Sequence, residues 1–258
     1  GVDVTVHSES RASFFIVKVW AKAMTAATTI HHSQSKNAQL MSGAEMILKT
    51  LAELGVEVIF GYPGGAVLPI YDEIYKQDKI KHILVRHEQA ATHAAEGYAR
   101  ATGKPGVVLV TSGPGATNAV TGLTDAMLDS IPMICITGQV ARHLIGNDAF
   151  QEADTVGITR PCTKHNYLVK ETSDISKVLS EAFYVATNGR PGPVVIDMPK
   201  DVQVDKDVFM PLTQVKHRTY RPQMDGDDAA VRAAVKALAS AKQPVIYSGG
   251  GVINSGPN

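Results

Sequence analysis

The sequence has little of what several protein classes require. Its only two cysteines, Cys135 and Cys162, stand far apart and without the Cys or His spacing of a zinc site, so neither a disulfide framework nor a metal site is expected. The 25 Lys and Arg residues are balanced by 25 Asp and Glu residues, which leaves no basic excess for nucleic acid or an anionic membrane. No apolar run approaches the ~20 residues of a membrane helix. We therefore expect small-molecule ligands, with no nucleic-acid or membrane partner, in a reducing compartment.

The first part of the chain differs in composition from the rest. Between Ser10 and Ala44 there is no Asp or Glu, whereas Lys, Ser and Thr are frequent. This composition is typical of a transit peptide, and it also fits translated sequence upstream of an internal start at Met24 or Met41. We expect residues 1–41 to be an extension outside the fold. The protein is expected in the cytoplasm, or in an organelle if the extension is a transit peptide.

The central part of the chain alternates short apolar strands with helices. Ser42 is a candidate N-cap for a helix that stops at Gly55, and further helices are expected at residues 88–102 and 119–128. Strands are expected at residues 56–60, 83–85, 107–110, 133–136 and 194–196. Apolar, β-branched strands separated by helices predict an α/β fold with a mainly parallel sheet covered on both faces. We assign this domain to residues 42–200.

The last part of the chain has the pattern of a second domain that has only begun. Residues 201–225 are largely polar and contain Pro211 and Pro222, which is typical of a linker. Residues 227–239 then have a helical pattern and residues 245–247 an apolar strand pattern. One helix and one strand cannot bury a core of their own. We interpret residues 226–258 as the truncated start of a second α/β domain.

Three common motifs fail on spacing. Residues 97–104 have five residues between two glycines, where a Walker A loop has four. His87 and His93 lack the spacing of a zinc-protease helix, and Ser112 lacks the preceding glycine of a serine-hydrolase turn. The Gly-rich turn at residues 113–118 does stand between a strand and a helix, where backbone N–H groups can face a ligand. Alone, it is either a ligand loop or a structural turn.

Glu88 stands where an α/β sheet binds its ligands. It follows the strand at residues 83–85 and begins a helix, so we expect it at the carboxyl edge of the sheet. An acidic residue at a helix N-terminus is also common without any chemistry, because it interacts favourably with the helix dipole. Position alone leaves both interpretations open, and the surrounding residues decide between them.

Seven sequence blocks occur in an order that resembles one enzyme family. They are Phe60-Gly-Tyr-Pro-Gly-Gly65, Arg86-His-Glu-Gln89, Gly97-Tyr-Ala-Arg100, Thr111-Ser-Gly-Pro-Gly-Ala-Thr-Asn118, Asp148-Ala-Phe-Gln-Glu-Ala-Asp154, Cys162-Thr-Lys-His-Asn166, and Gly189-Arg-Pro-Gly-Pro193 with Pro199-Lys-Asp201. Together they resemble the large catalytic subunit of acetolactate synthase, from about residue 42 to residue 258. The first three blocks and the Gly-rich turn occur in thiamine-diphosphate enzymes generally. Residues 148–154 and the Lys200 region point to the synthase itself.

The resemblance implies a reaction and a set of site residues. The family decarboxylates pyruvate with thiamine diphosphate and condenses the product with a second pyruvate or with 2-oxobutyrate, the first common step of branched-chain amino-acid biosynthesis. Glu88 would hydrogen-bond N1′ of the aminopyrimidine ring, and Gln151 and Gly65 would lie at the reacting centre. The other implied contacts are Tyr62, Pro63, Gly64, Thr111, Pro114 and Asn118 with thiamine diphosphate, Arg190 with FAD, and Ala66, Ala141, Phe150 and Lys200 with the substrate and inhibitor channel.

Two departures from the family pattern have consequences. Ala141 stands where the family usually carries Pro, in the channel where herbicidal inhibitors bind, so weakened sulfonylurea inhibition is expected. The family's Gly-Asp-Gly motif, which with a following Asn holds Mg²⁺ and the diphosphate, does not occur in the 258 residues. Because the family builds each site between two subunits, this chain alone is expected to be inactive.

Several functional alternatives stay open. Pyruvate oxidase or a 2-oxoacid decarboxylase would share the general blocks, and the reaction product distinguishes them from the synthase. If the protein is not an enzyme, the alternative function is that of a non-catalytic binding module. For the synthase, the resemblance implies a homodimer or tetramer and a regulatory small subunit.

Overall fold

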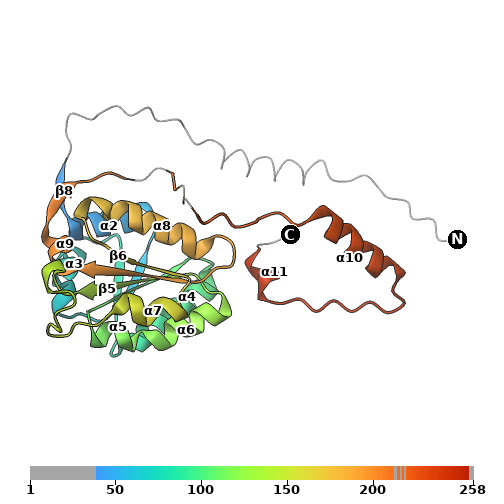
Figure 1. Cartoon of the computed structure of the whole chain (residues 1–258), viewed down its shortest axis with the longest axis horizontal. Coiled ribbons are helices and arrows are strands. Elements are labelled where there is room, and N and C mark those ends of the chain that lie inside the picture. The colour runs from blue at the N-terminus through green and yellow to red at the C-terminus, as the bar shows by residue number, and fades with distance from the viewer. Residues whose placement is uncertain (1–38, 212–213, 216, 218, 256–258) are drawn as a thin grey trace. The chain divides into compact units, whose positions relative to one another are not determined.

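A six-stranded parallel sheet with helices on both faces forms the main domain (Figure 1). The structure, a computed structural model, describes residues 39–211, 214–215, 217 and 219–255. Across the sheet the strands are β3 (Lys81–Leu84), β2 (Val58–Gly61), β4 (Gly106–Val110), β5 (Met133–Gln139), β7 (Pro193–Pro199) and β6 (His165–Leu168). Every pair of neighbours in this sheet is parallel. The predicted α/β fold is confirmed.

The two faces of the sheet bury separate apolar cores. In β4, Val107 and Leu109 belong to one core cluster, and Val108 and Val110 belong to the other. Successive side chains of a strand point to opposite faces, so a strand buried on both sides is apolar throughout. The helices α2 (Gly43–Glu53), α3 (Leu68–Tyr75) and α8 (Ile175–Thr187) cover the first face; α4 (Glu88–Thr102) and α6 (Val120–Asp129) cover the second. Figure 1 shows α2 and α8 on one side of the sheet and α4 and α6 on the other.

Local sequence signals set the helix ends. Ser42 and Glu45 form a capping box at the start of α2: the Ser42 hydroxyl accepts from the Glu45 N–H at 3.2 Å, and the Glu45 carboxylate accepts from the Ser42 N–H at 2.7 Å. After α2, Gly55 has φ +79°, a conformation that favours glycine. The helix expected at residues 88–102 is α4.

The Gly-rich segment at residues 113–118 differs from the expected turn. Only Gly113, with φ +51°, is a turn residue, and Pro114 begins a short helix, α5 (Pro114–Asn118). Proline suits the first helical position because its φ is already helical and its missing N–H is not needed there. The following helix, α6, lies where residues 119–128 were expected to be helical.

Residues 201–209, expected to open a linker, fold back into the domain instead. They include most of α9 (Lys200–Val204), in which Val202 and Gln203 are fully buried, and β8 (Lys206–Val208). β8 pairs antiparallel with β1 (Leu40–Ser42). The remaining short elements are η1 (Gly65–Val67), η2 (Arg142–Leu144), α7 (Thr155–Thr159), η3 (Arg160–Cys162) and η4 (Thr172–Asp174).

The C-terminal region forms helices but no strand in its described part. The expected helix at residues 227–239 is present as α10 (Asp228–Ser240), and α11 (Gly250–Asn254) follows. The prediction of a strand at residues 245–247 is wrong: Val245 is 90% and Tyr247 100% exposed, and these residues form no strand. A strand requires a neighbour to pair its backbone groups, and described residues 223–255 are all exposed.

The interpretation of residues 1–41 falls almost wholly outside the described residues. None of the described helices is long and apolar enough to cross a membrane.

Candidate active site

The carboxyl ends of β2 and β4 meet at the point where the chain changes direction across the sheet. From β2 the chain passes through α3 on one face, and from β4 it passes through α6 on the other. In parallel α/β sheets, ligands bind in the crevice at such a switch point. Here the Tyr62 N–H donates to the Leu109 carbonyl at 3.1 Å, and the Ala66 N–H donates to Oγ1 of Thr111 at 3.3 Å.

Gly64 and Gly65 lie on this crevice with different surroundings. A Cβ on Gly64 would lie 2.5 Å from Cβ of Thr111, so Gly64 is glycine because the end of β4 packs against it. A Cβ on Gly65 would meet nothing within 4 Å, and Gly65 is exposed. Tyr62 and Pro63, just before the pair, are exposed as well. The loop after β2 is thus anchored at Gly64 and open at Gly65.

Glu88 is the buried carboxylate of this edge. It is the first residue of α4, only 8% exposed, and follows β3 closely in the chain. Nδ2 of Asn118, at the end of α5, donates to Oε2 of Glu88 at 3.0 Å. A Cβ on Gly115 would lie 3.5 Å from Oε1 of Glu88. Oε1 accepts no hydrogen bond from a described residue, which leaves one oxygen of a buried carboxylate available to a ligand.

A loop at residues 146–154 brings Gln151 to the start of α5. Gln151 has φ +58°, a conformation that costs a non-glycine residue roughly 1–3 kcal/mol and that gathers at functional sites. The Glu152 carboxylate holds the loop by accepting from the Gly146 and Ala149 N–H groups, and these bonds lower the pKa of Glu152. A Cβ on Gly113 would overlap the Gln151 carbonyl. Gly113 therefore allows the loop and α5 to touch.

A buried acid, Asp197, anchors the other end of the same loop. Asp197 is 1% exposed in β7 and accepts from Oγ1 of Thr137 at 2.7 Å and from Nε2 of Gln139 at 2.9 Å. Nε2 of Gln139 also donates to the Ala153 carbonyl at 3.0 Å. Burial raises the pKa of Asp197 to about 7, against the two donors, which lower it. The network ties β5 and β7 to the segment that follows Gln151.

Arg142 positions the segment after β5. Its backbone N–H and Nε donate to the two carboxylate oxygens of Asp201 at 3.0 and 2.8 Å, and Nη2 donates to Asp205 at 2.6 Å. Paired Arg and carboxylate bonds of this kind fix orientation as well as distance. They hold Ala141 beside α9, whose first residue is the exposed Lys200.

Comparison with known proteins identifies the kind of domain that carries this edge. The sequence profile described as "Thiamine pyrophosphate enzyme, N-terminal TPP binding domain" matches residues 41–158, which contain β2 to β5 and Glu88. Residues 41–158 of the chain therefore belong to this family of thiamine pyrophosphate enzyme domains. The edge built from β2, β3 and β4 lies within the matched residues and is the candidate ligand-binding edge of that domain.

Within this family the chain is similar to acetolactate synthase large subunits. It is 55% identical over 219 residues to that of Buchnera aphidicola subsp. Schizaphis graminum, covering 84% of this chain and 38% of the relative. The Escherichia coli isozyme 3 large subunit is 54% identical over 220 residues, with the same coverage, and the Corynebacterium glutamicum large subunit is 51% identical over 231 residues, or 90% of this chain and 37% of the relative. The resemblance to the N-terminal part of these subunits is confirmed. The chain spans a little over a third of their length.

The TPP-binding domain brings most of the predicted site residues to one edge. Contacts link Gly64 to Thr111, Thr111 to Gly115, and Gly115 through Glu88 to Asn118. Gln203 in α9 donates to the Ala66 carbonyl at 2.8 Å, and this hydrogen bond fixes the backbone directly after Gly65. Pro114 and Phe150 are exposed, Phe150 to 88%.

Arg190 is not brought together with these residues. It precedes β7, so it lies at the amino edge of the sheet, the edge opposite Glu88. Its Nε donates to Oγ of Ser130 at 2.8 Å, and its Nη2 donates to the carbonyls of Met127 and Leu128 at 3.1 Å. These bonds cap the C-terminus of α6, where unpaired carbonyls favour a cation.

Sequence reasoning missed three residues that shape the site: Gln139, Arg142 and Asp197. One signal was available for Asp197. An acidic residue inside a fully buried apolar strand requires donors, because an unpaired buried charge is costly. Gln139 and Arg142 carry no comparable signal, since their partners, Ala153, Asp197 and Asp201, come from distant parts of the sequence.

Proposed function

We propose that this chain is the pyrimidine-binding part of an acetolactate synthase. The proposed enzyme decarboxylates pyruvate with thiamine diphosphate and condenses the product with a second pyruvate or with 2-oxobutyrate, in branched-chain amino-acid biosynthesis. Identities of 51–55% to acetolactate synthase large subunits support this choice of enzyme. The observation that carries the chemistry is the buried Glu88, with one oxygen bound by Asn118 and the other available.

The described residues fit the aminopyrimidine half of thiamine diphosphate. Gly65 leaves open space at the crevice, Gly115 keeps the approach to Glu88 free of a side chain, and Asn118 fixes the carboxylate plane. When bound, thiamine diphosphate supplies the electron sink for decarboxylation of a 2-oxoacid. The protein supplies binding, orientation and control of protons.

Each site residue then has a specific task. Glu88 holds or shares a proton at the ring nitrogen that reaches Oε1, in a position closed to water by burial. Asn118 keeps Oε2 engaged, so that Oε1 is the oxygen that faces the ligand. Gln151, held by the strained loop, is proposed to reach the reacting centre, with Phe150 shaping the apolar side of the substrate pocket. Ala66, Ala141 and Lys200 are proposed to line the channel.

Mg²⁺ and FAD are proposed cofactors whose binding depends on other groups. The one group of three potential metal ligands among the described residues lies on α4 and α6, not at the carboxyl edge. We therefore assign the Mg²⁺ ligands to another domain of the enzyme and derive no step through the ion. Arg190 is the proposed FAD contact; Nε and Nη2 are engaged with α6 and Ser130, while Nη1 donates to no described residue.

The assembly and location of the enzyme are proposals as well. Because Gly65 and Glu88 offer one side of a site, we propose that a second subunit completes it, in a homodimer or tetramer. The relatives' designation as large subunits supports a regulatory small subunit. We propose a cytoplasmic enzyme, or an organellar one if residues 1–41 are a transit peptide.

An acetolactate assay tests the proposal. The full-length protein that contains this chain is supplied with thiamine diphosphate, Mg²⁺, FAD and pyruvate, beside its Glu88→Gln variant. Acetolactate is expected from the first, and Glu88→Gln should lower kcat by about 100-fold or more, since it removes a proton-transferring group. Glu57→Gln is the matched control: Glu57 is exposed, pairs with Lys104 and stands before β2, so activity should be unchanged.

The product identifies the alternatives. Acetyl phosphate or a free aldehyde in place of acetolactate would assign the chain to pyruvate oxidase or a decarboxylase. No turnover despite bound thiamine diphosphate would favour a binding module. Unchanged turnover in Glu88→Gln would refute the role of Glu88 even if acetolactate is formed.

A further inference from the structure

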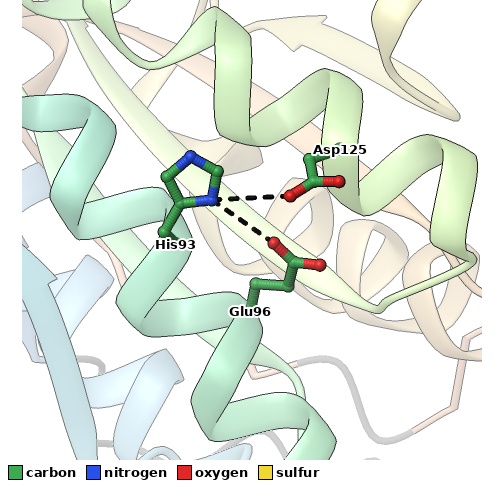
Figure 2. Close-up of side chains that lie close together, drawn as sticks. All are labelled: His93, Glu96 and Asp125. Carbon is green, nitrogen blue, oxygen red and sulfur yellow. Dashed lines mark ion pairs between the residues drawn. The ribbon is translucent and has the colours of Figure 1, made fainter.

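Three potential metal ligands meet on one flank of the domain, outside the candidate active site. Figure 2 shows His93 and Glu96 on α4 and Asp125 on α6, with their polar ends directed toward one another. Nδ1 of His93 lies 3.5 Å from Oε2 of Glu96 and 3.5 Å from Oδ2 of Asp125. The ligand atoms of the three residues all lie within 4.8 Å of one another.

Helix geometry places these side chains together. His93 and Glu96 are three residues apart, so they share one face of α4. Asp125 stands three residues after Gly122, where α6 packs closely against α4: a Cβ on Gly122 would overlap the Thr92 hydroxyl. The close approach carries the Asp125 carboxylate to the face of α4 that holds His93. This juxtaposition depends on two helices and is invisible to a search for local metal motifs.

Neighbouring residues orient the ligand atoms. Arg100 donates through Nε and Nη2 to Oε1 of Glu96, at 3.2 and 2.6 Å, and this turns Oε2 toward His93. The Glu96 side chain is only 6% exposed, yet Oε2 accepts no hydrogen bond from a described residue. The Gln89 side-chain amide lies 3.5 Å from Nε2, the ring nitrogen of His93 that does not face the carboxylates. A second shell that fixes ligands in this way is a regular feature of metal sites.

Charge and spacing favour a cation among the three groups. Two carboxylate oxygens face one ring nitrogen, an arrangement that attracts a cation, and one of these oxygens belongs to a side chain more than nine-tenths buried. Zn²⁺ binds His nitrogen and carboxylate oxygen at about 2.0–2.2 Å in tetrahedral geometry, which separates neighbouring ligand atoms by roughly 3.4 Å. The two separations of 3.5 Å from Nδ1 match that arrangement, and the two carboxylate oxygens lie within 4.8 Å of each other.

We propose that Nδ1 of His93, Oε2 of Glu96 and Oδ2 of Asp125 bind one Zn²⁺ ion, with water as the fourth ligand. An imidazole ligand suits zinc and other late transition metals, whereas Mg²⁺ prefers oxygen ligands alone. The site is therefore distinct in chemistry from the Mg²⁺ proposed for the reaction. By joining α4 to α6, a bound ion would stabilise the helix that begins with Glu88.

Zinc titration of the 258-residue chain tests the site, with binding heat and thermal unfolding as the two readouts. One equivalent of Zn²⁺ is expected to bind and to raise Tm, since a ligand that binds only the folded state stabilises it. His93→Gln and Asp125→Asn should each weaken binding by about 100-fold or more, a larger loss than the 10–100-fold typical of second-shell changes. His143→Gln, which removes an exposed imidazole on η2, should leave binding unchanged.

Two further comparisons keep the result decisive. Millimolar Mg²⁺ should not displace the zinc, because the nitrogen ligand discriminates against it. Asp125 is 48% exposed, so Asp125→Asn should keep the fold, which circular dichroism verifies. Absence of zinc binding, equal affinity in Asp125→Asn and the unsubstituted chain, or displacement by Mg²⁺ would each overturn the proposal.

Discussion

The substitution Asp197→Asn tests whether burial raises the pKa of the Asp197 carboxyl in the folded domain. Asp197 is 1% exposed, and burial raises its pKa from 3.8 to about 7. A pKa difference of about three between the folded and unfolded chain corresponds to roughly 4 kcal/mol of stability, because each pKa unit is worth about 1.4 kcal/mol. Asn keeps the shape of Asp and cannot ionise. It can accept from Nε2 of Gln139 and donate to the Thr137 hydroxyl, which is free to turn, so the network keeps both contacts.

The sign of the effect follows from which state holds the proton. Between about pH 4 and pH 7 the folded chain keeps the Asp197 proton, whereas the unfolded chain has released it. The contribution of Asp197 to the free energy of unfolding therefore falls as pH rises through this window, and it levels off above the pKa of Asp197 in the folded chain. The stability of the unsubstituted chain minus that of Asp197→Asn should thus decrease by about 4 kcal/mol from pH 4 to pH 7.5.

Urea unfolding followed by circular dichroism, repeated across this pH range, measures the difference directly. Groups that are common to both chains cancel in the subtraction. Asp72→Asn, an exposed position on α3, is the matched control and should keep the pH dependence of the unsubstituted chain. A difference that stays constant with pH would refute the raised pKa of Asp197. A difference that increases with pH would show that Thr137 and Gln139 stabilise the carboxylate more than burial destabilises it.

The other predictions concern the crevice and the channel. Gly64→Ala should lower the free energy of unfolding by about 1–3 kcal/mol, because its Cβ would press on Thr111. Gly65→Ala should leave Tm unchanged and weaken thiamine diphosphate binding, since its Cβ would meet no described atom within 4 Å and would face the proposed cofactor; equal melting curves with equal cofactor affinity would contradict it. Ala141 has φ −57° and its N–H donates to no described residue, so Ala141→Pro should stabilise the chain by about 0.5–1 kcal/mol. In the full-length enzyme the same change should strengthen sulfonylurea inhibition, and unchanged inhibition would place the inhibitor channel elsewhere.

The sequence predicts the buried strands β4, β5 and β7 and the helix α4 well, but it does not predict the helix α8. Strands covered on both faces must be apolar throughout, so β4, β5 and β7 stand out from the helices between them. The helix α4 is bounded by an acidic first residue and by Gly103, whose φ of +72° ends it.

Two short strands, β6 and β8, are not predicted from the sequence. The strand β6 has the sequence His-Asn-Tyr-Leu and lies at the sheet edge, where one side has no neighbour, so it needs no apolar run. The strand β8 owes its conformation to pairing with β1, more than 160 residues away. In both cases the deciding contact is tertiary and leaves no periodic pattern in the sequence.

The edge of the sheet at which a residue lies limits the role that a family resemblance can assign to it. Gly64, Glu88 and Thr111 each follow a strand, and parallel strands end at a common edge, so their gathering follows from strand positions alone. Arg190 precedes β7, which has seven residues and therefore separates Arg190 from that edge by about 20 Å. A small ligand cannot contact both Arg190 and Glu88. If Arg190 contacts FAD, the flavin must extend along the domain to approach thiamine diphosphate, so substitution of Arg190 should change FAD affinity while leaving thiamine diphosphate affinity intact.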